Sequence, residues 1–171
     1  PVHFIKGSAH DDAVLEKANI GHAQFVLITA DPHKAEEDAD KDTIVALLAA
    51  KSLNPSVYAI VEILTARNVQ NAFRAGADEV IQTNLLAGTA MAASLRSPGI
   101  ASAIERMLGR FGEQTLRLLP PTEQQIGQPF AAVQLLLLEQ NMMLLGVIRG
   151  DNGNLAVLPQ RPIEKNDRLF V

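Results

Sequence analysis

The chain has 171 residues, of which 47% are hydrophobic and 20% are charged, with a formal net charge of −4 and no cysteine. This composition is typical of a globular protein and excludes an intrinsically disordered chain. The absence of cysteine excludes disulfides and thiolate metal sites. The negative net charge, with no basic stripe, argues against nucleic-acid binding. No apolar run reaches the roughly 18 residues that a membrane-spanning helix needs.

The first 83 residues predict an alternation of strands and helices. Buried parallel strands read as continuous apolar runs, and Phe25–Thr29 and Val57–Val61 have this character. Asp11 or Asp12 can cap an early helix, and Asn54-Pro55 ends a later one. The expected strands are 2–5, 25–29, 57–61 and 78–81, and the expected helices 12–18, 43–53 and 65–75. This order predicts parallel strands joined by right-handed crossovers.

The stretch "AFRAGADEVI" predicts a helix end, a tight turn and a short last strand. Gly76 stands where a helix often ends in a left-handed residue, a conformation that glycine adopts without steric cost. Residues 85–108 then predict two apolar helices broken at Ser97-Pro98-Gly99. Their apolar faces have no obvious cover in one chain, which indicates a partner surface.

From residue 114 the pattern changes to short strands around turn signals. Gly150–Asn154 is a clear hairpin turn, and Pro120-Pro121 lies at the entry to this part. We therefore divide the chain into an α/β part at 1–83, a helix-turn-helix crossover at 84–113 and a small α+β subdomain at 114–171.

The ordered set of segments resembles the regulator of potassium conductance (RCK) domain. The matching pieces are "FIKGSAHDDAVLEKANI", "AQFVLITAD", "NPSVYAIVE", "NVQNAFRAGADEVI", "IGQPFAAVQL", "GVIR" and "KNDRLFV". The resemblance implies a Rossmann-like α/β fold, a crossover at 84–108 that pairs identical subunits, and a C-terminal subdomain. The strand at 2–5 then belongs to a partial Rossmann-like sheet whose first strands and glycine-rich loop are missing. We expect such a chain to expose one side of its sheet and to need a complementing piece or partner.

Ligands of open α/β sheets bind at the carboxyl ends of the strands. From the resemblance, Gly7, Ser8, Thr29, Ala30 and Asp31 flank an adenine nucleotide, ADP, ATP or NAD/NADH. Many family members have an aspartate where this chain has Ser8. Glu62, which ends an apolar strand, is a further candidate contact to the nucleotide.

A divalent cation such as Ca²⁺ is the alternative ligand. In calcium-gated relatives acids lie at the ends of two neighbouring strands, and Glu62 matches one of them. Thr29 and Leu64 stand at the other matching positions, so the calcium site is incomplete. The acids of the segment 36–42 are more simply interpreted as a solvated helix start. The four histidines show no ligand spacing, Arg149 is expected to face solvent, and Met142-Met143 to pack in a core.

The resemblance implies a non-enzymatic, ligand-sensing regulatory domain of a potassium channel. It would assemble into a gating ring on the cytoplasmic side of the cell membrane and act on the pore domain of its parent chain. Two alternatives stay open: a regulatory subunit of a potassium-uptake transporter or cation–proton antiporter, and a fragment of an NAD-dependent oxidoreductase. The sequence shows no catalytic acid–base constellation to support the last, and the part at 114–171 is too small for a typical substrate domain.

Overall fold

A computed structural model describes residues 2–108, 116–149 and 154–171 of the chain. These residues form two compact units, 1–98 and 99–171, and each is described by itself. Both units have the predicted class: the first has a parallel sheet with helices, and the second an antiparallel sheet with one helix. The domain boundaries after residues 83 and 113 stay a prediction.

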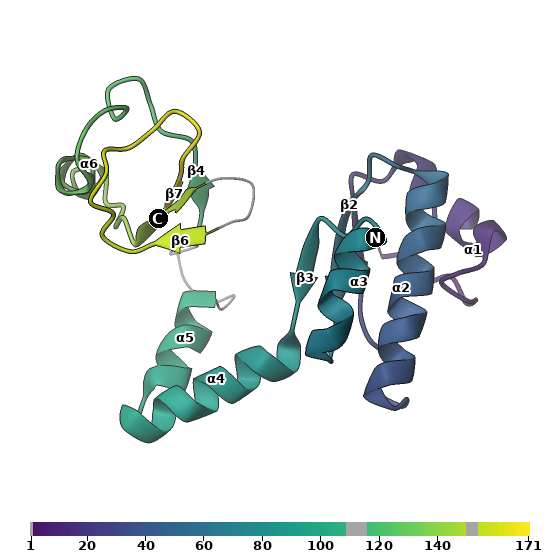
Figure 1. Ribbon diagram of the computed structural model, residues 1–171. Coiled ribbons are helices and arrows are strands. Elements are labelled where there is room, and N and C mark those ends of the chain that lie inside the picture. The colour runs from purple at the N-terminus through teal and green to yellow at the C-terminus, as the bar shows by residue number, and fades with distance from the viewer. Residues whose placement is uncertain (1, 109–115, 150–153) are drawn as a thin grey trace. The chain divides into compact units, whose positions relative to one another are not determined.

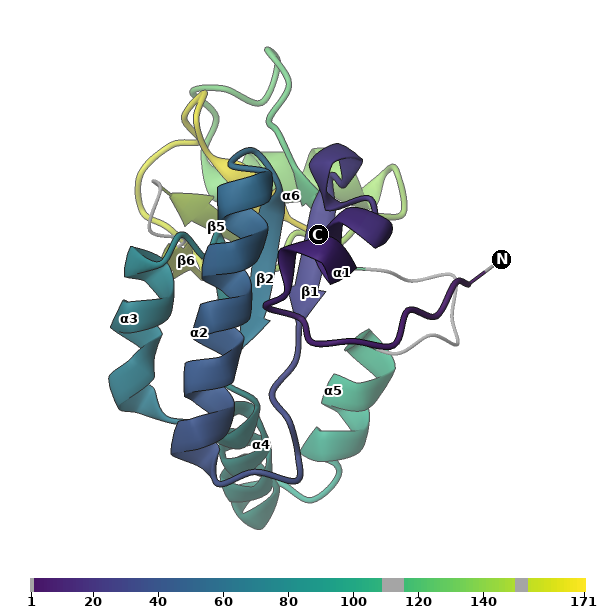
Figure 2. The same ribbon diagram turned by 90° about the vertical axis from the view of Figure 1, so that its right-hand side faces the viewer.

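The first unit is a three-stranded parallel sheet in the order β1-β2-β3. The strands are β1 (Phe25–Ile28), β2 (Tyr58–Glu62) and β3 (Glu79–Ile81). The helices are α1 (Asp12–Lys17), α2 (Glu36–Leu53), α3 (Val69–Arg74) and α4 (Thr83–Arg96). Short 3₁₀ turns lie at Ile20–His22 and Ala66–Asn68. Figures 1 and 2 show α2 and α3 side by side along the sheet.

One face of this sheet is packed and the other is open. Side chains alternate along a strand, so Val26, Ile28, Ala59 and Val61 face the core with Leu47 of α2 and Ala72 of α3, among others. On the opposite face Phe25 and Leu27 are 68% and 64% exposed. Phe25 packs edge-on against Tyr58 there, with ring centroids 5.8 Å apart. The expectation that the strand at 25–29 is buried is therefore wrong for one face of the sheet. The sheet does have an exposed side, as the partial fold led us to expect.

The predicted strand at 2–5 is also absent. These residues pair with no strand, and Val2 and Phe4 are 82% and 95% exposed. In a dinucleotide-binding sheet with order 3-2-1-4-5-6, the third strand is not a neighbour of the fourth. If 2–5 is the third and β1 the fourth, the two cannot pair, and a lone strand leaves its backbone groups without partners.

The predictions that depend only on residues near one another in the chain are confirmed. The Asp11 side chain accepts a hydrogen bond from the Ala13 backbone N–H at 2.9 Å and caps α1. Gly76 follows α3 with φ of +100°. The chain breaks between α4 and α5 (Ile100–Leu108) at the predicted proline and glycine, with Gly99 at φ of +96°.

The second unit is a four-stranded antiparallel sheet in the order β4-β7-β5-β6. Helix α6 (Phe130–Leu138) supplies Phe130, Val133 and Leu137 to the core shared with the sheet. The strands are β4 (Leu118–Leu119), β5 (Gly146–Arg149), β6 (Asn154–Ala156) and β7 (Arg168–Phe170). The predicted turn at 150–154 lies largely outside the described residues, but β5 and β6 on either side pair antiparallel.

Asp40 is a buried carboxylate that joins α2 to the segment after β2. It has no exposed surface and accepts hydrogen bonds from the backbone N–H groups of Leu64 and Thr65 at 2.7 and 3.1 Å. It also accepts from the Thr65 hydroxyl at 2.5 Å and the Asn68 amide at 2.9 Å. Desolvation raises the pKa of Asp40, but these hydrogen bonds together outweigh it and hold the pKa below its usual value.

Asp78 is a second carboxylate that joins α2 to β2, at the start of the strand. Its Oδ2 accepts from the Ala59 backbone N–H and from Lys51 Nζ, both at 2.7 Å. Lys51 Nζ also donates to the Val57 carbonyl at 2.7 Å. Desolvation raises the Asp78 pKa, but the Ala59 hydrogen bond and the charge and hydrogen bond of Lys51 lower it overall. Two carboxylates thus hold the start and the end of β2.

Replacing Asp40 by Asn should lower the free energy of unfolding by about 3 kcal/mol at pH 7. The amide keeps one acceptor oxygen but turns a donor toward groups that are themselves donors, and hydrogen bonds to a buried charge are worth about 1.5–3 kcal/mol each. Urea denaturation of the chain measures the loss. Asp42→Asn is the control, since Asp42 pairs with Lys34 at the surface and should change stability by less than about 1 kcal/mol.

The lowered pKa values of Asp40 and Asp78 predict that the fold loses stability in acid. Folded-state pKa values of Asp40 and Asp78 below the ordinary value of about 3.9 mean that their contribution is present above that pH. It is lost as pH falls from there toward the folded-state pKa values. Urea midpoints measured between pH 7 and pH 3 should therefore fall more steeply for the wild-type chain than for Asp40→Asn. Parallel curves would contradict this assignment.

Candidate functional site

Glu62 connects the carboxyl ends of the parallel strands. It is the last residue of β2, and its Oε2 accepts from the Ala30 backbone N–H, two residues after β1, at 2.9 Å. Its Oε1 accepts from the hydroxyl of Thr83, two residues after β3, at 2.7 Å. Side chains at the carboxyl ends of parallel strands meet at one edge, where open α/β sheets bind ligands. Ala30, Glu62 and Thr83 form one connected group there, and we call it the edge group.

The loop after β1 places Asp31 beside this group. Asp31 follows Ala30 directly and is half-buried, while Thr29 is exposed. Its Oδ1 accepts from the His33 backbone N–H at 2.9 Å, which closes a turn at the start of the segment leading to α2. Of the candidate residues from the sequence, Ala30 and Glu62 are joined by a hydrogen bond, and Thr29 and Asp31 flank Ala30.

Gly7 and Ser8 lie apart from this hydrogen-bonded group. Both are exposed, and the Ser8 hydroxyl is 3.0 Å from a ring nitrogen of His10. A Cβ added to Gly7 would meet the Val14 side chain at 2.4 Å, so the backbone approaches α1 closely at this glycine. Within the described part of the chain, no hydrogen bond joins Gly7 or Ser8 to the edge group. Their contact with a nucleotide stays a prediction.

No cation site is assembled around Glu62. Among the described residues, no three histidine or acidic side chains come together in a way that could hold a metal ion. Calcium takes six to eight oxygen ligands, often from several carboxylates. The two oxygens of Glu62 instead accept hydrogen bonds from within the chain. Glu62 as a metal ligand stays a prediction without a second carboxylate to support it.

The acids at the start of α2 each have a partner in the chain. Glu36 accepts a hydrogen bond from the side-chain amide of Asn84 at 3.0 Å, and Asn84 directly follows Thr83 of the edge group. The other exposed acids form ion pairs: Glu37 with Arg67, Asp38 with Lys41, and Asp42 with Lys34. The interpretation of a solvated helix start is wrong for Asp40, which is fully buried. Its spacing from Thr43 and Leu47 places it on the core-facing stripe of α2, a signal that the sequence carried.

Arg149 does not face solvent as the sequence suggested. Its guanidinium donates to the carbonyl oxygens of Arg161 and Pro162 at 3.2 and 2.8 Å, and its Nε lies 3.4 Å from Oδ1 of the buried Asp167. These contacts hold the segment before β7 against β5. Met142 packs partly against the core as expected, but Met143 is 60% exposed.

Residues 2–83 match the family model described as the TrkA-N domain. The chain is 40% identical over 150 residues to the Bacillus subtilis protein named "Putative potassium channel protein YugO", across 85% of this chain and 44% of that protein. It is 20% identical over 166 residues to "Potassium channel protein 1" of Methanocaldococcus jannaschii, across 97% of this chain and 48% of that protein. The chain thus spans about half the length of these curated relatives.

The fold is shared with a solved gating ring. The structure of the human SLO3 gating ring matches with a TM-score of 0.76 and 20% identity, over 98% of this chain and 35% of that chain. At this identity the match shows a common fold.

In the ranges 2–108, 116–149 and 154–171, no helix has both the length and the apolar character needed to cross a bilayer.

The two hydrogen bonds of Glu62 generate a stability prediction. In a double-mutant cycle of Glu62→Ala and Thr83→Val, we expect a coupling of about 1 kcal/mol in the free energy of unfolding, since each change removes the hydrogen bond between these two side chains. The control cycle pairs Glu62→Ala with Thr29→Val, because Thr29 is exposed and no hydrogen bond among the described residues joins it to Glu62. Equal couplings in the two cycles would show that the Thr83–Glu62 bond contributes nothing specific.

Proposed function

We propose that this chain, whose residues 2–83 match the TrkA-N family model, is an RCK-type, ligand-sensing regulatory module of a potassium channel. The observation that carries the proposal is 40% identity across 85% of the chain to a protein named as a potassium channel protein. A module of this kind acts on the pore domain of its parent protein from the cytoplasmic side of the cell membrane. It binds a ligand and transmits the effect of binding to the pore domain, and it catalyses no reaction.

Helices α4 and α5 provide the surface for self-assembly. Neither helix contributes a buried residue within this chain. On α4 the exposed apolar residues include Leu86 and Leu95, which are 62% and 87% exposed, and on α5 they include Leu108, which is 72% exposed. Contiguous exposed apolar surface is characteristic of protein interfaces. We therefore place the contact with an identical subunit on residues 84–108, giving a dimer that a larger ring can contain.

The edge group is the proposed ligand site. A nucleotide at the carboxyl edge of the sheet would contact Thr29, Ala30 and Asp31, with Glu62 as a hydrogen-bond acceptor for a ribose hydroxyl or an amino group. ADP, ATP and NAD/NADH all present such donors, and Gly7 and Ser8 complete the proposed contact set. Ca²⁺ is the alternative ligand, with Glu62 as one of its contacts.

In the proposed mechanism, gating depends on a difference in ligand affinity between the open and the closed arrangement. A ligand shifts a pore equilibrium only by binding the open and closed arrangements differently. Moving a pore from about 1% to about 99% open takes about 5.5 kcal/mol of differential binding. Identical sites on one ring can share this requirement. Since Glu62 hydrogen-bonds Thr83 at the first residue of α4, a ligand that competes for Glu62 acts on the helix that carries the assembly surface.

We expect the full-length parent protein to respond to an adenine nucleotide through the edge group. Thermal unfolding is measured with ADP, ATP, NAD, NADH, Ca²⁺, Mg²⁺ and Na⁺, and a ligand at a hundred times its dissociation constant should add about 2.7 kcal/mol. Potassium flux from liposomes containing the same protein should change with that ligand. Asp31→Asn and Glu62→Gln should abolish both responses, while Asp42→Asn should leave them intact.

The outcomes separate the alternatives. Potassium flux coupled to a proton gradient would favour an antiporter, and a parent protein that acts only after addition to a separate transporter would favour a potassium-uptake regulator. Turnover of a nicotinamide cofactor would indicate an oxidoreductase. A response to cations alone, lost in Glu62→Gln, would favour the Ca²⁺ alternative, and no response to any ligand would exclude the edge group as a sensor.

Self-assembly should depend on the apolar surface of α4. Leu95→Lys introduces a charge at a residue that is 87% exposed, so the isolated chain should fold as before but lose its dimer. Analytical ultracentrifugation across a concentration series measures the change, with at least a tenfold weaker association expected. Val157→Lys, at an apolar residue 65% exposed on the second unit, is the control. Equal effects of the two changes would place the interface elsewhere.

A further inference from the structure

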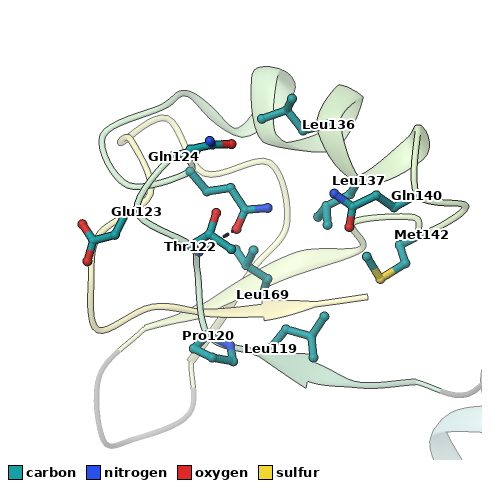
Figure 3. Close-up of a pocket in the computed structure, with 11 residues that line it drawn as sticks. Leu119, Pro120, Thr122, Glu123, Gln124, Leu136, Leu137, Gln140, Met142 and Leu169 are labelled. Atoms are coloured by element: carbon teal, nitrogen blue, oxygen red, sulfur yellow. Dashed lines mark hydrogen bonds between the residues drawn. The ribbon is translucent and has the colours of Figure 1, made fainter.

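The second unit contains a cavity of its own, of about 410 Å³, within the range of about 300–1,000 Å³ that small-molecule sites occupy. It lies between the segment that follows β4, the end of α6 and β7 (Figure 3). Its lining residues all belong to this unit, and they come from 119–125, 136–142 and Leu169.

The cavity has an apolar part that belongs to the core. Leu137 and Leu169 line it and are 2% and 1% exposed, and Met142 packs against the same core cluster. Figure 3 shows Leu137, Gln140 and Met142 on one side and Thr122, Glu123 and Gln124 on the other. An apolar ligand body between these walls would replace water on side chains that the fold already holds in place.

Gln125 brings an unpaired hydrogen-bond donor to this cavity. The residue is only 6% exposed, and its Oε1 accepts from the Thr122 backbone N–H at 2.8 Å. This bond assigns the oxygen, so the NH₂ group is the free end of the amide. Across the described residues, no protein group accepts a hydrogen bond from it. The NH₂ nitrogen of Gln125 is not among the fully buried side-chain atoms that lack a partner, so water can reach it, and an acceptor on a ligand in the cavity would take the place of that water.

The charge of the lining disfavours anions. Glu123 is its one ionisable side chain, and the lining contains no lysine, arginine or histidine. The remaining polar residues are amides and a hydroxyl, which hydrogen-bond neutral groups. Phosphate or carboxylate groups would meet a carboxylate and no cation. The cavity therefore differs in chemistry from the proposed nucleotide site on the first unit.

We propose that this cavity is a second ligand site, which binds a small neutral molecule with an apolar body and one carbonyl-type acceptor. The acceptor takes the hydrogen bond of the Gln125 NH₂ group, and the apolar body lies against Leu137, Met142 and Leu169. Since the site is built from β7, α6 and the entry segment of one subunit, its occupation stiffens the second unit directly.

Benzamide is the probe, because it has an apolar ring and a neutral carbonyl, and benzoate and benzamidine have nearly the same shape with opposite charges. In ¹H–¹⁵N NMR titrations of the whole 171-residue chain, benzamide should bind saturably and shift resonances of 119–125, 136–142 and 169. Benzoate should bind about tenfold more weakly or not at all, because Glu123 repels it and no cation offsets the charge.

Gln125→Glu tests the donor, since it keeps an acceptor for the Thr122 N–H but replaces the NH₂ group by oxygen. Benzamide should bind it about tenfold more weakly, and benzamidine should bind more tightly than to the wild type. Gln160→Glu, the same change at an exposed glutamine that does not line the cavity, should leave benzamide affinity within about twofold.

A second variant guards against a folding defect in Gln125→Glu. Leu136 lines the cavity from α6 and is 38% exposed, so Leu136→Trp should be tolerated and should fill the space and block benzamide. The proposal is overturned if benzamide does not saturate, if benzoate binds equally well, if both glutamine variants weaken binding equally, or if the shifted resonances belong to α4 and α5.

Discussion

The buried carboxylate of Asp40 is the contact on which the geometry of the first unit depends. It attaches α2 to the backbone of Leu64 and Thr65, directly after the point where β2 ends. Asp78 attaches the start of β2 to Lys51 of the same helix. The position of Glu62 along the sheet edge is therefore set by two charged groups that lie outside the site. A carboxylate without exposed surface is tolerable only because its hydrogen bonds replace those of water.

Incomplete burial is the second feature that organises the molecule. The sheet is covered by α2 and α3 on one face, while Phe25 and Leu27 remain exposed on the other. Helices α4 and α5 contribute nothing to either core of this chain. Burial of apolar surface is the main favourable term in folding and in association. The exposed apolar surface of the sheet and of α4 and α5 agrees with the proposed role in an assembly.

The two units offer different chemistry to ligands. The edge of the parallel sheet presents a carboxylate, backbone groups and a hydroxyl, suited to polar ligands with many donors. The cavity of the second unit presents apolar side chains and amides without a positive charge. Each site is made from residues of one unit alone, and Gln125 and Glu62 belong to separate hydrogen-bond networks.

Local pattern by itself determined the class of both units, the α1 cap at Asp11, the left-handed Gly76 and the break at Ser97-Pro98-Gly99. These features involve only residues near one another in the chain, so propensity and steric preference suffice to predict them. The resemblance to a family, with its ordered segments, added the interpretation of 84–108 and of the sheet edge. It also placed Ala30 and Glu62 at the same site, which the structure joins by a hydrogen bond.

Only the tertiary structure decided which of these residues are paired and which are exposed. Residues 2–5 have the composition of a strand, but among the described residues they find no strand with which to form a ladder. Phe25 and Leu27 have the composition of a buried strand, but no described helix buries their side chains. The spacing of Asp40 from Thr43 and Leu47 indicates the buried side of α2, but the donors to its carboxylate lie 24 to 28 residues further along the chain. Hydrogen bonding and burial depend on groups that are distant in sequence, so periodicity along the chain carries no information about these partners.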